Sequence, residues 1–180
     1  YLNNPNGFDN FTQIGGTHLP NFEDQNVTII SDIGGISPNF PTLICKTFTA
    51  TEFIFIETNM NFEYLDGNSF RGCSKLEFLQ LVNNNLMSLS EDTFVNNPHL
   101  LRIFLFSNKL EVLPPNIFTS LSELIELNLS SNRLIEVNSN SFPSSIQALS
   151  LNDNKIHAID PQVFIKNAVN LRFLALERNV

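Results

Sequence analysis

The stretch that decides the fold is LIELNLSSNRL, Leu124 to Leu134. It carries leucine at its first, fourth, sixth and eleventh positions and asparagine at its ninth, and this frame recurs along the chain. Besides Asn132, the frame asparagines are Asn59, Asn84, Asn108, Asn154 and Asn179. Their spacing of 22 to 25 residues is typical of architectures in which each repeat forms one turn of a coil.

The frame also predicts a parallel sheet. Side chains alternate along a strand, so the frame leucines would face the core and the residues between them would face out. Each strand would pair with that of the next repeat, about 4.8 Å away, and together they would form the inner, concave wall. The predicted strands span residues 53–57, 78–82, 102–106, 126–130, 148–152 and 173–177.

A second series, of phenylalanines, runs beside the asparagines. Ten residues after four of the asparagines come Phe94, Phe118, Phe142 and Phe164. Phe70 would belong to the same series, displaced by one extra residue that precedes Phe62. We predict that these rings pack as a spine in the core, which accounts for part of the 17 phenylalanines of the chain.

The two series resemble the leucine-rich repeat family from about Ile29 to Val180, specifically its typical class of roughly 24 residues with a phenylalanine spine. The resemblance implies an α/β-type repeat solenoid, a right-handed arc with a parallel concave β-sheet. Its convex side would consist of loops and 3-10 turns with few regular helices. It also implies that the frame asparagines are buried and bond to backbone groups of neighbouring repeats.

The predicted organisation is an irregular N-terminal arm or cap over residues 1–26 and a leucine-rich repeat domain over residues 27–180. That domain would hold one degenerate repeat and about six further ones. In the degenerate repeat, Ile29 lies one period before Ile54 and Gly34 takes the place of the asparagine. The chain starts at Tyr1 without a signal-like segment, which fits a processed protein and equally a trimmed piece.

Charge and hydropathy limit the kinds of partner that the chain can bind. The formal net charge is −8 and no Lys/Arg-rich run occurs, so nucleic acid and anionic membrane surfaces are poor partners. The apolar runs are also too short for a membrane span of about 20 residues.

The two cysteines, Cys45 and Cys73, fall at core positions of adjacent repeats on the convex side. In an oxidising compartment they are plausible disulfide partners, while two buried free thiols are the alternative. Asn10, Asn26 and Asn128 begin N-x-S/T triplets and are glycosylation candidates if the chain is secreted.

The outward positions of the first three predicted strands are unusually apolar. Large apolar patches on soluble proteins usually mark interfaces, and aromatic side chains are favoured anchors. Two alternatives remain: the arm covers the patch, or a one-residue register error turns these side chains inward. We name as the aromatic patch, and predict as partner-binding, Phe53, Phe55, Phe78, Val82, Phe104 and Phe106.

Catalysis has little support in the sequence. His18, His99 and His157 fall in the arm and in two different turns, and neither a phosphate-binding glycine loop nor metal-ligand spacing occurs. We therefore predict no enzyme activity, no catalytic residues, no metal and no cofactor.

The resemblance favours a secreted, extracellular module that binds a protein through its concave face, as such proteins do in receptors, cell adhesion and innate immunity. The alternative is a self-assembling structural or adhesive extracellular protein. Its copies would join through the aromatic patch or through an open C-terminal repeat at residues 171–180.

Overall fold

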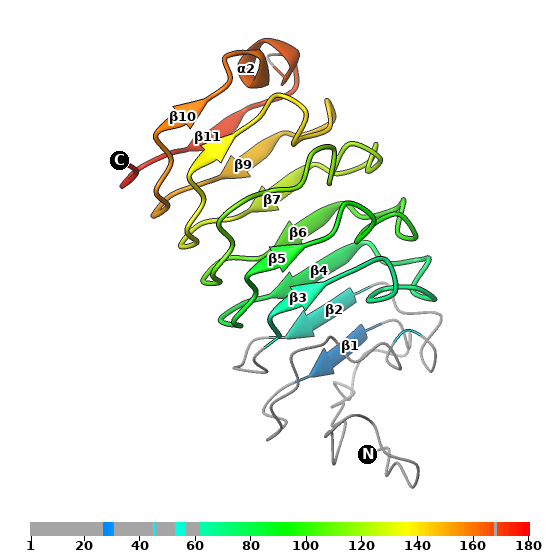
Figure 1. Ribbon diagram of the computed structural model, residues 1–180. Coiled ribbons are helices and arrows are strands. Elements are labelled where there is room, and N and C mark those ends of the chain that lie inside the picture. Colours follow the sequence, from blue (N-terminus) through cyan, green and yellow to red (C-terminus); the bar gives the residue numbers. More distant parts are fainter. Residues whose placement is uncertain (1–26, 31–44, 46–52, 57–61, 168) are drawn as a thin grey trace, which may run out of the picture.

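A computed structural model describes residues 27–30, 45, 53–56, 62–167 and 169–180. Its repeats stack in chain order, each forming one turn of a coil (Figure 1). The chain is thus a parallel-strand solenoid, as predicted. The arm predicted for residues 1–26 and the frame asparagine Asn59 lie outside the described residues.

One parallel sheet runs along the coil, and its strands follow one another in chain order. Each strand ends one or two residues before its predicted end. The sheet consists of β1 (Val27–Ile30), β2 (Phe53–Ile56), β4 (Phe78–Leu81), β6 (Arg102–Phe104), β7 (Glu126–Asn128), β9 (Ala148–Ser150) and β11 (Phe173–Ala175).

The register of this sheet aligns the frame leucines. Leu79 pairs with Ile103 and Ile103 with Leu127, and all three side chains are fully buried. The predicted register of the degenerate repeat is wrong by one residue, because Ile29 pairs with Phe55 rather than with Ile54. Its offset from β2 is therefore 26 residues, outside the spacing of the other repeats.

The residue before each described frame asparagine has a left-handed backbone. This conformation turns the chain out of the sheet, and the turn is held from the next repeat: Ser107 N–H donates to Ser130 O at 3.0 Å. The φ angles are 55° at Asn83, 58° at Ser107, and 54° at Ser131, Asp153 and Arg178.

The predicted asparagine ladder is confirmed as buried at Asn84, Asn108, Asn132 and Asn154, whereas Asn179 is half-buried. Asn132 Nδ2 donates to Leu105 O at 2.9 Å and to Leu129 O at 3.0 Å. Its Oδ1 accepts the Leu110 N–H at 3.1 Å. Asn108 and Asn154 repeat these contacts, so each amide joins its own repeat to the one before.

We expect Asn132→Ala to lower the free energy of unfolding by about 1–3 kcal/mol, because it leaves a buried N–H and buried carbonyls without a hydrogen-bond partner. Urea or thermal denaturation followed by circular dichroism measures the loss. Asn140→Ala, at an exposed asparagine of the same repeat, serves as control and should change little. An unchanged melting temperature for Asn132→Ala would contradict the structural role of the ladder.

The spine is confirmed for four of its five predicted members. Phe70, Phe94, Phe118 and Phe142 are buried, and their neighbouring ring centroids lie 6.0, 5.5 and 6.4 Å apart. The prediction for Phe164 is wrong, since that side chain is 36% exposed.

Phe164 lies on the short helix α2 (Gln162–Asn167). There Val163 and Asn167, one helical turn apart, are the buried residues, so Phe164 is turned off the buried face. In this repeat the helix therefore buries other residues, and its phenylalanine does not join the spine.

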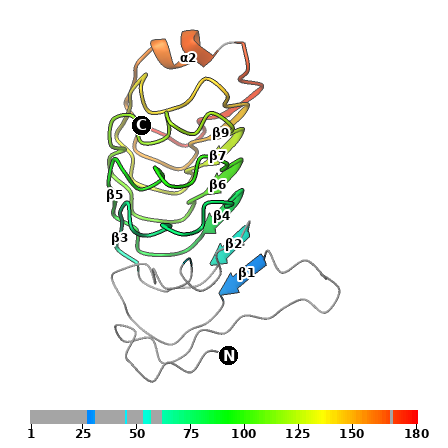
Figure 2. The ribbon, with the colours of Figure 1, turned by 90° about the vertical axis from the view of Figure 1, so that its right-hand side faces the viewer.

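Two short parallel pairs lie on the side of the coil away from the main sheet, where the sequence predicted only loops and 3-10 turns. β3 and β5 occupy this side in Figure 2. The pairs are β3 (Tyr64–Leu65) with β5 (Ser88–Leu89), and β8 (Glu136–Val137) with β10 (Ala158–Ile159).

Candidate partner-binding surface

The aromatic patch has its described centre at Phe78 on β4 and Phe104 on β6. Both side chains are half-buried, and their rings meet edge to face with centroids 5.1 Å apart and an interplanar angle of 78°. In the register Phe104 lies opposite Gln80, so the two phenylalanines are diagonal neighbours across adjacent strands. Such a pair is stabilised by ring geometry beyond its buried area.

The remaining predicted members differ from one another. Phe106 is half-buried, but Val82 is only 5% exposed, so the expected exposure of Val82 is not found. The reason is that β4 ends at Leu81, beyond which strand alternation no longer fixes the direction of a side chain. The backbones of Phe53 and Phe55 pair with Phe78 and Gln80, which places both residues on the strand beside the centre of the patch.

The surface becomes polar immediately beyond the patch. Arg102 Nε lies 3.3 Å from Glu126 Oε2, with both side chains partly exposed, so this ion pair contributes little to stability. Asn128, Ser130 and Ser150 follow with half-buried side chains. The main sheet therefore presents aromatic groups on its early strands and mainly polar groups on β7 and β9, and the exposed Phe173 follows on its last strand, β11.

A second apolar surface was missed by the sequence reasoning. We name as the exposed row Tyr64, Met87, Val112 and Ile135, which are 41%, 48%, 51% and 40% exposed. The last three lie three or four residues after a frame asparagine, and that spacing is the sequence signal that could have found them. Tyr64 lies on β3, Met87 immediately precedes β5 and Ile135 immediately precedes β8, which places them on the side of the coil that carries the short strand pairs.

The cysteines form a disulfide, so the structure has the bonded pair rather than two free thiols. Their Cα atoms lie 4.8 Å apart, and both residues are fully buried. Gly72 has φ +106°, and a Cβ there would lie 2.7 Å from Cys45 O, so only glycine fits beside the bond.

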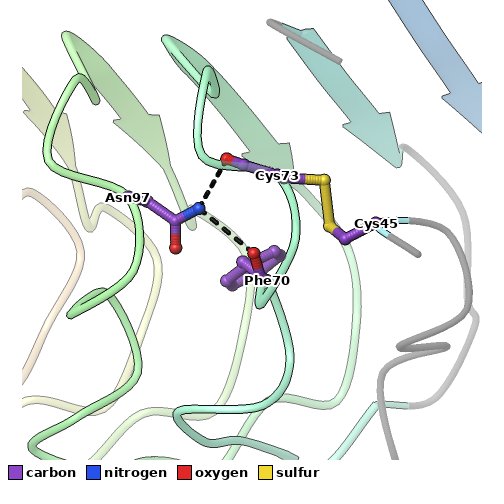
Figure 3. Close-up of a disulfide and its surroundings, with 4 residues drawn as sticks. All are labelled: Cys45, Phe70, Cys73 and Asn97. Atoms are coloured by element: carbon purple, nitrogen blue, oxygen red, sulfur yellow. Dashed lines mark hydrogen bonds between the residues drawn. A yellow bond between two sulfur atoms is a disulfide. The ribbon is translucent and has the colours of Figure 1, made fainter. Parts of the chain in front are cut away.

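Asn97 extends this contact to the following repeat. Its Nδ2 donates to Cys73 O at 2.8 Å and to Phe70 O at 3.2 Å, as Figure 3 shows. Asn97 lies three residues after Phe94, as Cys73 lies three after Phe70. The disulfide and the Asn97 contacts thus link three successive repeats.

The carboxyl groups with shifted pKa values lie outside the strands, in turns or at the start of a helix. The hydrogen bond from Arg178 lowers the pKa of the Asp153 carboxyl. The backbone N–H of Gln162 lowers the pKa of Asp160 at the start of α2. Both pKa shifts therefore arise from local contacts that hold a turn or a helix end.

We also searched the described residues for metal-binding groups, paired titratable side chains and membrane-spanning helices. Within it, no three His, Cys, Asp or Glu side chains gather into a metal-binding group. His99 Nδ1 lies 3.2 Å from Glu123 Oε1, and both side chains are about half exposed. Among the described residues, no helix has the length and apolar character needed to cross a membrane.

Comparison with known proteins identifies the repeats. Residues 74–134 match the family model described as leucine rich repeat. A search of curated proteins finds no match.

Solved structures share the architecture at low sequence identity. The chain resembles the structure of the Toll–Spatzle complex of Drosophila, with TM-score 0.72 and 18% identity over 86% of this chain and 23% of that one. It also resembles a TLR13–ssRNA13 complex, with TM-score 0.59 and 18% identity over 86% and 25%. A leucine-rich repeat protein of Leptospira interrogans gives TM-score 0.60 and 21% identity over 80% and 35%.

At such identities the likeness concerns the fold. The chain spans between about a quarter and a third of the length of these structures. Their fold, the family match at residues 74–134 and the confirmed asparagine ladder agree with one another. Residues 74–134 are therefore leucine-rich repeats, and the described part of the chain has the fold of a leucine-rich repeat solenoid.

Proposed function

We propose that this chain is an extracellular recognition module that binds a protein partner through the aromatic patch. The observation that carries the proposal is the edge-to-face pair of Phe78 and Phe104, with Phe106 beside it, on the outward side of the main sheet. Partly exposed aromatic rings are enriched at the centres of protein interfaces and depleted from ordinary surfaces.

The sheet holds the backbones of these aromatic residues in fixed positions before a partner binds. Phe78 and Phe104 are held by strands that pair on both edges, so their backbones are fixed before a partner arrives. Fewer degrees of freedom are then lost on association, which favours affinity. The Arg102–Glu126 pair at the border supplies the polar rim that surrounds such contacts.

The disulfide supports the extracellular part of the proposal. Stable disulfides are characteristic of oxidising compartments and rare in the cytosol. The structural neighbours include a Toll complex and a TLR13 complex, which is consistent with such a setting.

The test is Phe104→Ser combined with Phe106→Ser. The partner is first captured from native extracellular fluid on the immobilised wild-type chain, identified, and purified. We expect the double variant to bind that protein at least about 30-fold more weakly, since interface hot spots contribute about 2 kcal/mol or more. Both side chains are half-buried, so a circular dichroism melt must show that the variant keeps its fold.

Met87→Ser combined with Val112→Ser is the matched control. It removes apolar surface of the exposed row and should leave binding unchanged. Loss of binding in this control, with retention in the phenylalanine variant, would assign recognition to the opposite side of the coil and overturn the proposal.

Light scattering across a concentration series tests the self-assembly alternative. A recognition module should stay monomeric at every concentration. An oligomer that disappears in the double phenylalanine variant would identify a second copy of the chain as the occupant of the patch, in place of a different protein.

A further inference from the structure

We infer that Asn128 carries an N-linked glycan on the outward surface of β7. Asn128, Leu129 and Ser130 form an N-x-S triplet within residues that the structure describes. Leu129 between them is fully buried, whereas Asn128 and Ser130 are both half-buried. Both functional residues of the triplet therefore reach the same, accessible side of the sheet.

The amide of Asn128 is oriented for modification. Its Oδ1 accepts the backbone N–H of Ser130 at 3.0 Å. Its Nδ2, the atom to which the sugar attaches, has no hydrogen-bond partner among the described residues. A bond to Nδ2 therefore removes no contact from the fold.

The frame asparagine Asn132 shows the contrast within the same repeat. It is 7% exposed, and its Nδ2 donates to three backbone carbonyls. A glycan on such an amide would break the ladder. The repeat thus holds one asparagine committed to the scaffold and one whose amide nitrogen is available.

The neighbouring strands leave room for a sugar. Asn128 lies opposite Phe104 on β6 and opposite Ser150 on β9. Beyond Ser150 the register reaches Ala175, so the residues level with Asn128 on that side are small, and the large exposed Phe173 of β11 lies level with Glu126 and Ala148. A bulky, hydrated glycan can extend over this later part of the sheet.

The compartment that forms the Cys45–Cys73 disulfide also supplies the modification. Oxidising conditions in the secretory pathway favour the disulfide, and N-x-S/T triplets are accepted in the same pathway. In the transfer, Nδ2 forms a bond to the anomeric carbon of an oligosaccharide carried on a lipid diphosphate. The bond from that carbon to the diphosphate oxygen breaks, and the amide proton leaves with the diphosphate.

The inference stands independently of the proposed partner. A glycan on β7 would make the later strands inaccessible to a protein and, because Asn128 lies opposite Phe104, would border the aromatic patch at β6 and leave it open from β4. If both proposals hold, the footprint of the partner ends at β6.

Peptide mapping of the full chain, secreted from animal cells behind an added signal segment, tests the site. Trypsin releases residues 110–133 between Lys109 and Arg133, a peptide in which Asn128 begins the one N-x-S/T triplet. We expect most of this peptide to carry glycan mass. Enzymatic release in heavy-oxygen water should leave an isotope-labelled acid at that position.

Two variants separate the site from other modifications. Ser130→Ala keeps Asn128 but should abolish the glycan, whereas Ser130→Thr should retain it. Recovery of the unmodified 110–133 peptide from secreted, disulfide-bonded wild-type protein would overturn the inference. Glycan that persists in Ser130→Ala would do the same. Neither result depends on a binding partner, so the proposed function stands or fails separately.

Discussion

Replacing Phe118 with alanine should lower the free energy of unfolding by about 3–5 kcal/mol. The Phe118 ring is fully buried and stacks on two neighbours, Phe94 at 5.5 Å and Phe142 at 6.4 Å. Its removal costs transfer free energy and leaves a cavity between three repeats. The asparagine ladder and the sheet register hold these repeats in place, so they cannot close that cavity by moving together.

Phe164→Ala is the matched control for this prediction. Phe164 has the same spacing from its frame asparagine, but it is 36% exposed on α2. Its truncation should cost clearly less, about 1 kcal/mol, because little of its contact area is lost. Urea denaturation of the two variants measures the difference. Equal losses would show that the position in the frame, rather than the burial of each ring, determines its contribution to stability.

The predictable part of the fold is the part that repeats. Asn132 and Phe118 could be assigned from sequence because the same chemistry recurs at one spacing, so every copy supports the others. A frame asparagine needs backbone partners in two repeats, and that need leaves little freedom in where the chain turns. The parallel sheet followed from the same constraint.

The structure differs from the sequence prediction where local structure, rather than the repeat pattern, decides which side chain is buried. At Phe164 a helical turn buries Val163 and Asn167 instead. At Val82 the strand has already ended, so alternation gives the wrong exposure. The exposed row escaped prediction because the frame says nothing about side chains on the short strand pairs. These positions depend on contacts of individual residues, which periodicity does not encode.

The aromatic patch illustrates a further limit. The sequence could place Phe78 and Phe104 on adjacent strands, but their edge-to-face contact depends on the diagonal register and on side-chain rotation. Whether a partner uses them depends on a second molecule. The scaffold that presents the patch follows from the repeats, whereas its use in binding depends on the chemistry of the partner.

The disulfide gives the second large expected effect. We expect Cys45→Ala combined with Cys73→Ala to lower the free energy of unfolding by about 3–4 kcal/mol, from the loop-closure entropy of a 28-residue separation. Replacing both cysteines avoids leaving one reactive thiol. The bond also holds Cys73 in the turn where Asn97 Nδ2 contacts Cys73 O and Phe70 O, so its loss should loosen adjacent repeats.

Amide hydrogen exchange locates this effect. Because each repeat of a solenoid contacts only its neighbours, exchange should accelerate at β2 and β4 and remain nearly unchanged at β9. Wild-type protein held under reductant through denaturation provides the control, since it loses the bond but keeps both side chains. It should lose nearly the same stability as the double variant. If reduction left stability unchanged while the double variant lost it, packing of the two side chains, rather than the covalent link, would be what stabilises these repeats.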